Sequence, residues 1–287
     1  MHDTLQPGGD ILLEHERHTS DVRRAVDLLG TDGIAGLPSG FSRAWTQQLR
    51  EDIEVAFAAA RARPDGTVGR GRNRYYVEVY PEQLRGFVDL VEHPWVRDVS
   101  AAVLGPDHQF VEVGFDVPLA GAIDQPWHRD FASPVETWRD GRLTSLAFNL
   151  TAVDTTEDMG PFEIAPGTQW EDGADFGHGM FPPRSSWKRF EQRAVRKLPR
   201  MGDVSVRSAL TIHRGTANRS ALARPVLVLG VVAPGAGDAE EHDLVVSEAY
   251  WAQLPERVRG HLRCRVVPEL PPLRQRHTIE GLVMGDS

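Results

Sequence analysis

The spacing of hydrophobic residues changes near residue 109, and this change constrains the fold more than any other feature. Before it, apolar side chains recur every three or four positions, as in a helix with one buried face. This helical spacing is carried by Trp45, Leu49, Ile53 and Phe57. After it, apolar residues alternate with polar ones at Val111, Val113, Phe115 and Val117. A period of two is typical of a strand with one buried face, so the chain is predicted to be mainly β, preceded by helices.

Local signals delimit the predicted elements. A first helix is expected from Thr19 to Gly30, with Ser20 as its N-cap and Gly30 at its end, and a second from Ser42 to Arg61. Further helical pieces are expected at 82–92, 96–104 and 247–254. The predicted strands are 111–117, 146–151, 204–206 and 225–233. Short strands separated by turns rich in Pro, Gly and Asp indicate a sandwich or barrel instead of an α/β sheet.

The order of these elements predicts one domain over residues 1–287. Its parts are a helical N-terminal part (about 10–105), a β core (about 108–235) and a C-terminal extension (236–287). Residues 170–198 follow neither period and mix aromatic with charged side chains. An insertion of this length in a compact domain is usually a functional lid or a disordered segment. We predict a lid insertion, whose degree of order the sequence leaves open.

The composition excludes several classes of protein. The 287 residues are 40% hydrophobic and 25% charged, unlike collagen-like, coiled-coil or disordered chains. A net charge of -9 gives no reason to expect nucleic acid or an anionic membrane as a partner. No apolar run approaches a membrane helix, the first residues lack a signal peptide, and the single Cys264 permits no internal disulfide. We expect a cytoplasmic protein with a small-molecule substrate, either monomeric or homodimeric.

The segment Trp127-His128-Arg129-Asp130 is the sharpest local candidate for chemistry. Residues two apart in an extended segment project to the same side, so His128 and Asp130 could hold one ion, with His213 as a further ligand. Two imidazoles and one carboxylate form the facial triad of non-haem Fe(II) oxygenases, which leaves coordination positions open. Alone, a His-x-Asp pair is weak evidence, because His128 could simply be a strand-end histidine that hydrogen-bonds Asp130.

The surrounding sequence resembles a known family. The motifs WHRD, DTTEDMGPFEIAPGTQ and HRGTANRSALAR occur in this order, and Arg224 lies eleven positions beyond His213, where a predicted strand begins. A fixed arginine at such a position can bind a carboxylate through two parallel hydrogen bonds. Over residues 108–233 the pattern resembles the phytanoyl-CoA dioxygenase family, a branch of the Fe(II)- and 2-oxoglutarate-dependent oxygenases. The N-terminal helices resemble this family less.

The resemblance implies a fold, a metal centre and a co-substrate. The fold would be a double-stranded β-helix, a cupin-like jelly-roll core with the N-terminal helices packed outside. The implied iron ligands are His128, Asp130 and His213. Arg224 would bind the distal carboxylate of 2-oxoglutarate. Asn149 and Gln125 are weaker candidates for contacts with the co-substrate. The alternative for Asn149 is a strand position that faces solvent. The reaction would consume O2 and 2-oxoglutarate, release succinate and CO2, and oxidise an unactivated C–H bond.

Asp130 separates two branches of this chemistry. The related halogenases have a small residue at this position, which frees a site on iron for chloride. The carboxylate of Asp130 therefore favours a hydroxylase over a halogenase. Two alternatives stay open: a cupin-like metal enzyme that does not use 2-oxoglutarate, against which Arg224 argues, and a non-catalytic jelly-roll protein that binds a metal or ligand. Succinate formation distinguishes them.

The candidates for substrate binding rest on position alone. They are Arg72, Arg74, Tyr75, Tyr76 and Trp138. The alternative places the arginines on an exposed loop and the aromatic residues in the outer core. A contact with Arg72 or Arg74 would imply a substrate that carries a carboxylate or phosphate. We expect a small metabolite, such as one from secondary metabolism, because two lysines and no concentrated basic face give no reason to expect a CoA thioester.

Overall fold

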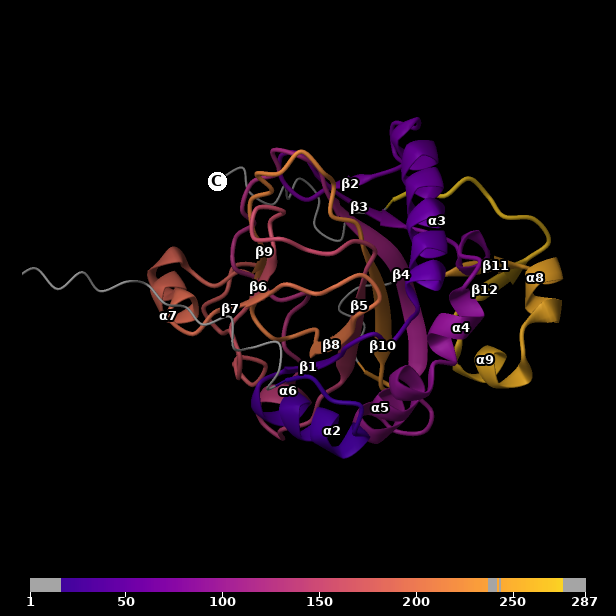
Figure 1. Ribbon diagram of the computed structural model, residues 1–287. Coiled ribbons are helices and arrows are strands. Elements are labelled where there is room, and N and C mark those ends of the chain that lie inside the picture. Colours follow the sequence, from indigo (N-terminus) through magenta and orange to yellow (C-terminus); the bar gives the residue numbers. More distant parts are fainter. Residues whose placement is uncertain (1–16, 237–241, 243, 276–287) are drawn as a thin grey trace, which may run out of the picture.

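Two antiparallel sheets form the centre of the protein. The computed structural model describes residues 17–236, 242 and 244–275, and predictions for the remaining residues lie outside it. The larger sheet has seven strands in the order β1-β8-β5-β10-β4-β3-β2, and the smaller has the order β7-β6-β9. The larger sheet contains β1 (Ile34–Leu37), β2 (Val68–Gly69), β3 (Arg74–Glu78), β4 (Gln109–Pro118), β5 (Ser145–Thr151), β8 (Val204–Ser208) and β10 (Val226–Val232). The smaller contains β6 (Phe162–Ile164), β7 (Val195–Lys197) and β9 (His213–Gly215). The helices lie outside the larger sheet and the smaller sheet lies across from it (Figure 1), which confirms the predicted jelly-roll fold.

The N-terminal part of the chain contributes to the sheet as well as to the helices. Both edges of the larger sheet come from it, because β1 pairs with β8 on one side and β2 pairs with β3 on the other. The predicted limit of the β core near residue 108 therefore does not divide helices from strands. The period-two signal is weak in these edge strands because they are only two to five residues long.

The helices that cover the larger sheet begin and end near the predicted positions. They are α2 (Val22–Thr31), α3 (Arg43–Arg61), α4 (Phe87–Val91) and α5 (Pro94–Leu104). In α3 the side chain of Ser42 accepts from the amide of Trp45, as an N-cap should. The prediction of Ser20 as the N-cap of α2 is wrong, because the carboxylate of Asp21 accepts from the amides two and three positions on, those of Arg23 and Arg24. Gly30 lies inside α2, and the left-handed residue after the helix is Gly33, with φ 75°.

The two faces of the larger sheet have different surroundings. Val113 and Phe115 of β4 pack in the main hydrophobic core, to which α5 adds Trp95. Glu112 and Asp116, which alternate with these residues along the strand, line a cavity between the two sheets. The polar half of the period-two pattern therefore faces an internal cavity, and this face carries the candidate site.

The remaining elements lie around this core. They are η1 (Pro81–Gln83), α6 (Val135–Trp138), η2 (Arg184–Ser186), α7 (Trp187–Glu191), β11 (Val245–Ser247), α8 (Glu248–Gln253), α9 (Glu256–His261) and β12 (Arg265–Val267). The predicted insertion 170–198 contains η2 and α7 but ends in β7, a strand of the smaller sheet, so its last residues belong to the jelly roll. Within the described part of the chain, every helix is too short or too polar to cross a bilayer.

Candidate active site

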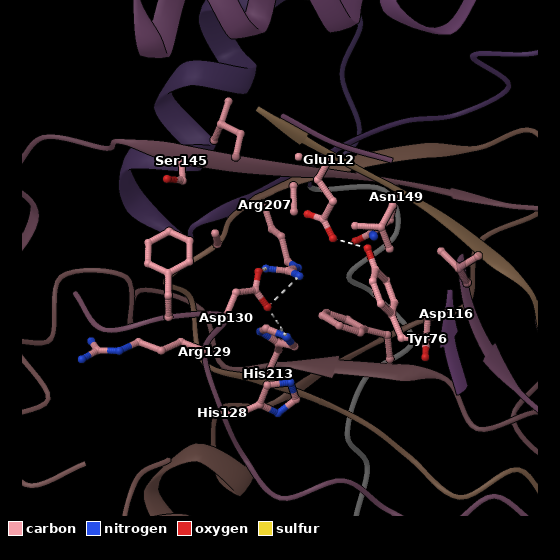
Figure 2. Close-up of a pocket in the computed structure, with 18 of the residues that line it drawn as sticks. Tyr76, Glu112, Asp116, His128, Arg129, Asp130, Ser145, Asn149, Arg207 and His213 are labelled. Carbon is pink, nitrogen blue, oxygen red and sulfur yellow. Dashed lines mark hydrogen bonds and ion pairs between the residues drawn. The ribbon is translucent and has the colours of Figure 1, made fainter. Parts of the chain in front are cut away.

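Backbone pairing places two histidines opposite each other. Residues 125–130 run antiparallel to residues 209–215, so that the amide of His128 donates to the carbonyl of His213 (2.9 Å) and the amide of His213 donates to that of His128 (2.8 Å). Asp130 is anchored in the same way, since its amide donates to the carbonyl of Ala209 (3.0 Å). The potential ligand atoms of His128, Asp130 and His213 lie within 4.8 Å of one another (Figure 2). The structure thus brings the three predicted metal ligands together.

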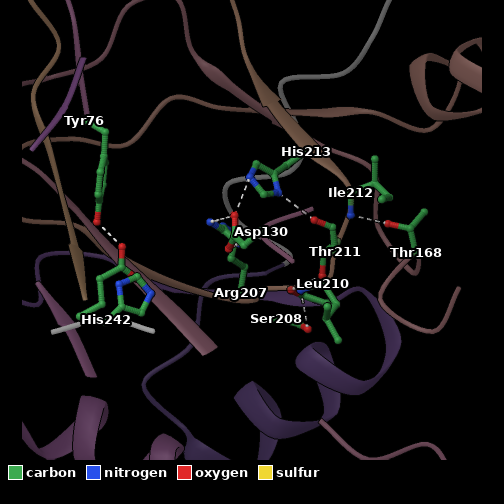
Figure 3. A network of polar contacts seen from close by, with 12 residues as sticks. Tyr76, Asp130, Thr168, Arg207, Ser208, Leu210, Thr211, Ile212, His213 and His242 are labelled. Carbon is green, nitrogen blue, oxygen red and sulfur yellow. Dashed lines mark hydrogen bonds and ion pairs between the residues drawn. The ribbon is translucent and has the colours of Figure 1, made fainter. Parts of the chain in front are cut away.

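Each histidine has one ring nitrogen fixed by the backbone. Nδ1 of His128 lies 2.8 Å from the carbonyl oxygen of Pro126, and Nδ1 of His213 lies 2.8 Å from that of Thr211 (Figure 3). A carbonyl oxygen only accepts hydrogen bonds, so both Nδ1 atoms carry the hydrogen and both Nε2 atoms keep a lone pair. Backbone partners of this kind fix the tautomer and orientation of metal-binding histidines. The Nε2 atom of His213 lies 3.3 Å from Oδ1 of Asp130.

The charges of these groups suit a divalent cation. Burial, followed by the neighbouring His213, holds the pKa of His128 well below its ordinary value, and burial followed by Arg207 lowers the pKa of His213. Burial alone would raise the pKa of Asp130, but the Arg207 guanidinium and His213 outweigh it and hold that pKa well below its usual range. Neutral imidazoles and an ionised carboxylate are the protonation states that bind a metal. The donor set therefore fits Fe(II).

The three ligands share a cavity of about 200 Å³ with Arg224, Asn149 and Gln125. Asn149 projects from β5 into this cavity instead of into solvent. Gln125 also supports β9, because its Oε1 accepts from the amide of Gly215 (2.9 Å). The register of the sheet separates the two ends of the cavity. Arg207, beside Asp130, lies opposite Ala147, whereas Arg224 precedes Val226, which lies opposite Thr151 at the other end of β5.

Arg224 is buried with little compensating charge. Its Nη2 atom is 4.0 Å from Oδ2 of Asp116, and the same carboxylate oxygen is 3.1 Å from Nη1 of Arg74. The Nε atom of Arg224 is buried and has no hydrogen-bond partner among the residues that the structure describes. Burial lowers the pKa of Arg224 to about 10, which still leaves it charged at neutral pH. A buried guanidinium that shares one carboxylate with a second arginine is well placed to bind an incoming anion.

Two glycines of the sheet make room for a polar pair in the cavity wall. The hydroxyl of Tyr76 donates to Oε1 of Glu112 (Figure 2), and both residues line the cavity. A Cβ atom on Gly114 would lie 2.4 Å from the Tyr76 hydroxyl, and one on Gly230 would lie 2.7 Å from Oε2 of Glu112. Larger residues at these two positions would displace the pair. His242 approaches it from the other side, with its Nε2 atom 3.7 Å from Oε2 of Glu112.

The other predicted substrate residues lie elsewhere. Arg72 is exposed and outside the cavity, and Arg74 is fully buried, donating to Asp116 and to the carbonyl of Thr216 (2.8 Å). The ring of Tyr75 packs outside the cavity under the guanidinium of Arg61, 4.2 Å from its centroid. Trp138 is 41% exposed on α6. Tyr75 and Tyr76 point in opposite directions because successive residues of a strand face opposite sides, so only Tyr76 of these candidates reaches the cavity.

Sequence reasoning missed two cations of the site. Arg207 donates to Oδ2 of Asp130 at 2.7 Å (Figure 2). Lys197 lines the cavity from β7. Arg207 alternates with apolar residues in β8, so the period-two pattern could have placed it on the inner face. Lys197 carried a compositional signal, because it is one of two lysines in a chain with 32 basic residues.

Arg129 connects the metal-binding segment to the predicted lid. It lies between His128 and Asp130, two of the predicted metal ligands, and is 1% exposed. Its guanidinium donates to the carbonyl oxygens of Glu171 (2.8 Å), Asp172 (2.9 Å) and Gly179 (2.8 Å). Burial lowers its pKa to about 10. The segment that these contacts hold also supplies Phe181 to the cavity wall.

Known proteins share this fold. SnoK, described as a non-heme α-ketoglutarate-dependent carbocyclase from nogalamycin biosynthesis, is 17% identical and superposes with a TM-score of 0.59 over 81% of this chain and 90% of its own. EctD from S. alaskensis, solved with 2-oxoglutarate and 5-hydroxyectoine, is 18% identical, with a TM-score of 0.59 over 74% of this chain and 76% of its own. HygX from Streptomyces hygroscopicus, solved with nickel and 2-oxoglutarate, is 14% identical, with a TM-score of 0.57 over 78% and 90%.

A family relationship is evident in the sequence as well. Residues 29–226 match the model of the phytanoyl-CoA dioxygenase family. This range contains the triad and Arg224, and it extends well into the N-terminal helices, beyond residues 108–233. The chain therefore belongs to the phytanoyl-CoA dioxygenase family, and it is a 2-oxoglutarate-dependent oxygenase whose His-Asp-His triad fits Fe(II).

Proposed function

We propose that this protein hydroxylates an unactivated C–H bond of a small metabolite, through one oxygenase domain that binds Fe(II) and 2-oxoglutarate. The observation that carries the proposal is the joint occurrence, in one cavity, of the triad and a buried arginine with an incomplete carboxylate partner. The nogalamycin enzyme in the same fold supports a role in secondary metabolism. Iron and O2 would supply the oxidising chemistry, which is coupled to conversion of 2-oxoglutarate to succinate and CO2.

The residues of the chain have separable roles in this proposal. Nε2 of His128, Nε2 of His213 and the carboxylate of Asp130 hold the iron, and the backbone partners of both Nδ1 atoms keep the rings oriented. Arg224 binds the distal carboxylate of 2-oxoglutarate and so fixes the direction in which the co-substrate lies. Asn149 and Gln125 are proposed to add polar contacts from the cavity wall. Asp130 favours hydroxylation over halogenation because its carboxylate occupies a position on the metal.

Substrate and water are controlled from the opposite wall. Tyr76 and Glu112 offer a hydrogen-bonded polar pair to the substrate, held in place by contacts between themselves. Met180 and Phe181 of the predicted lid add apolar surface to the same cavity. Excluding water protects a reactive site from side reactions. A lid that closes this wall is therefore part of the proposal.

An anaerobic titration tests the metal and co-substrate together. Protein loaded with Fe(II) is titrated with 2-oxoglutarate while the visible metal-to-ligand charge-transfer band is recorded. We expect a band in the wild type, none in His213→Ala, and a dissociation constant raised about 100-fold in Arg224→Met, because a charge-assisted bidentate contact is lost. Arg219→Met is the matched control, since this exposed arginine lies five positions before Arg224.

The outcomes separate the alternatives. A folded protein that binds Fe(II) but gives neither the band nor succinate would reject the 2-oxoglutarate proposal in favour of another metal enzyme or a binding protein. Succinate formed with O2, in an amount that rises when a substrate is added, identifies the substrate among candidate metabolites. Detection of the hydroxylated product then distinguishes hydroxylation from desaturation or cyclisation.

A further inference from the structure

Lys197 is a cation in the cavity without an acidic partner. It ends β7, and its Nζ atom lies 2.5 Å from the hydroxyl of Ser205 and 5.0 Å from the centroid of the Phe162 ring. Among the residues that the structure describes, no carboxylate lies within 4.0 Å of this ammonium. An ammonium that has lost much of its hydration and faces only a hydroxyl and a ring lacks the charge compensation that interiors usually provide.

Lys197 lies between the end of the cavity that holds the triad and the end that holds Arg224. Its partner Ser205 is opposite Asn149 in the register of the sheet, whereas Arg207 is opposite Ala147 and Arg224 lies beyond Thr151. The ring of Phe162 connects it to the metal end, since this ring stacks on His213 with centroids 4.9 Å apart. An anion that extends from the triad towards Arg224 therefore passes the Lys197 ammonium.

We infer that Lys197 is a further co-substrate-binding residue, whose ammonium joins Arg224 in binding the distal carboxylate of 2-oxoglutarate. The inference rests on the proposed function. Asp130 compensates Arg207, and Asp116 is shared by Arg74 and Arg224. One incoming carboxylate at this end of the cavity would complete the partners of both Arg224 and Lys197. Ser205, already hydrogen-bonded to Lys197, keeps the ammonium oriented when the anion is absent.

Binding of 2-oxoglutarate should therefore depend on pH. Burial, followed by Arg207 and Arg224, lowers the pKa of Lys197 to about 7. A bound carboxylate raises that pKa again, so binding takes up a proton and weakens as the pH rises through 7. The charges that act on Lys197 are those of Arg207 and Arg224. The other charged or titratable groups of the cavity wall are Arg70, Tyr76, Glu112, Asp116, His128, Arg129, Asp130, His213, His242 and Arg263. With one ammonium that titrates in this way, affinity falls about tenfold between pH 6 and pH 8.

The test uses the Fe(II)-loaded protein without O2 and 2-oxoglutarate as the ligand, followed by the charge-transfer band. Lys197→Met is expected to raise the dissociation constant at pH 6.5 by about 10- to 100-fold, the loss of one charge-assisted hydrogen bond, and to abolish the pH dependence. Lys197→Arg should restore most of the affinity without that pH dependence, because arginine stays charged. The matched control is Lys188→Met, which removes the other lysine of the chain, exposed on α7.

A second ligand locates the contact on the co-substrate. 2-Oxopentanoate has the chelating end of 2-oxoglutarate but no distal carboxylate, so its dissociation constant should be the same in wild type and Lys197→Met. An equal loss for both ligands would overturn the assignment and place Lys197 at the 1-carboxylate.

The remaining outcomes distinguish a failure of the Lys197 assignment from a failure of the proposed function. A Lys197→Met protein whose dissociation constant for 2-oxoglutarate stays within about twofold of the wild type refutes the role of Lys197 and leaves the proposed function intact. A wild type that binds Fe(II) without producing the band refutes the proposed function itself. Should Lys197→Met fail to fold, the wild-type pH profile compared with that of Lys197→Arg decides, because a purely structural lysine predicts the same profile in both.

Discussion

Removing the Arg129 side chain should loosen the predicted lid without removing a metal ligand. Arg129→Met keeps an apolar stem of similar length but leaves three carbonyl oxygens, of Glu171, Asp172 and Gly179, without their donor. Hydrogen bonds to a charged group contribute about 1.5–3 kcal/mol each, and such values are not additive within one side chain. A carbonyl oxygen left buried without its donor costs about 1–3 kcal/mol. We therefore expect the free energy of unfolding to fall by about 3–5 kcal/mol, since Arg129 is 1% exposed.

Two assays together test this reasoning. Urea unfolding measures the loss of global stability, and limited trypsin digestion measures local opening, because Lys188 and Arg189 are exposed on α7 within the segment that Arg129 holds. Digestion at these sites should accelerate in Arg129→Met under conditions where the rest of the protein stays folded. Arg139→Met is the control, because its guanidinium is exposed and pairs with the adjacent Asp140.

The same experiment can refute the argument. Arg129→Lys keeps a charge but cannot reach three carbonyls at once, so it should fall between the wild type and Arg129→Met. If Arg129→Met unfolds at the wild-type urea concentration and is cut no faster on α7, then the guanidinium does not hold the lid segment.

Three further predictions follow from the site. Asp130→Gly should weaken Fe(II) binding in equilibrium dialysis and lower stability, because it removes a proposed ligand and leaves Arg207 without its carboxylate; an Fe(II) affinity equal to that of the wild type would remove Asp130 from the ligand set. Arg74→Met should lower the free energy of unfolding by about 3–5 kcal/mol in urea, whereas Arg72→Met should leave it unchanged, because only Arg74 is buried on a carboxylate. Gly230→Ala should raise KM for the substrate while preserving the dissociation constant of 2-oxoglutarate, because its Cβ would displace Glu112; an unchanged KM would exclude this wall from substrate binding.

The sequence predicted the class of fold and the grouping of His128, Asp130 and His213 because both depend on local patterns. Strict alternation in residues 111–117 identified a strand with two unlike faces, and the i, i+2 spacing of His128 and Asp130 required only an extended backbone. Neither feature depends on contacts with distant segments of the chain. The family match and the structural neighbours confirm the family and the fold, and the structure brings the three predicted ligands together.

Other parts of the site could not be predicted, because they depend on contacts between distant segments. Arg74 looked like a loop residue, yet its burial follows from Asp116 on the neighbouring strand and from the carbonyl of Thr216, 142 positions away. Asp21 replaced Ser20 as a cap because both residues can serve in principle, and only the backbone angles at the start of α2 decide between them. Lys197 lies in the cavity wall because β7, which carries it, pairs with β6.

The alternating faces of the larger sheet have a consequence for how enzymes of this shape diversify. Side chains that stabilise the protein and side chains that contact ligands occupy successive positions of the same strands, Phe115 beside Asp116 and Phe148 beside Asn149. A substitution at an inward position changes the chemistry offered to a substrate while its neighbours keep the helices packed. The cavity wall can thus be altered one residue at a time on an unchanged scaffold, and Gly230 shows the limit of this freedom, because any side chain there would meet Glu112.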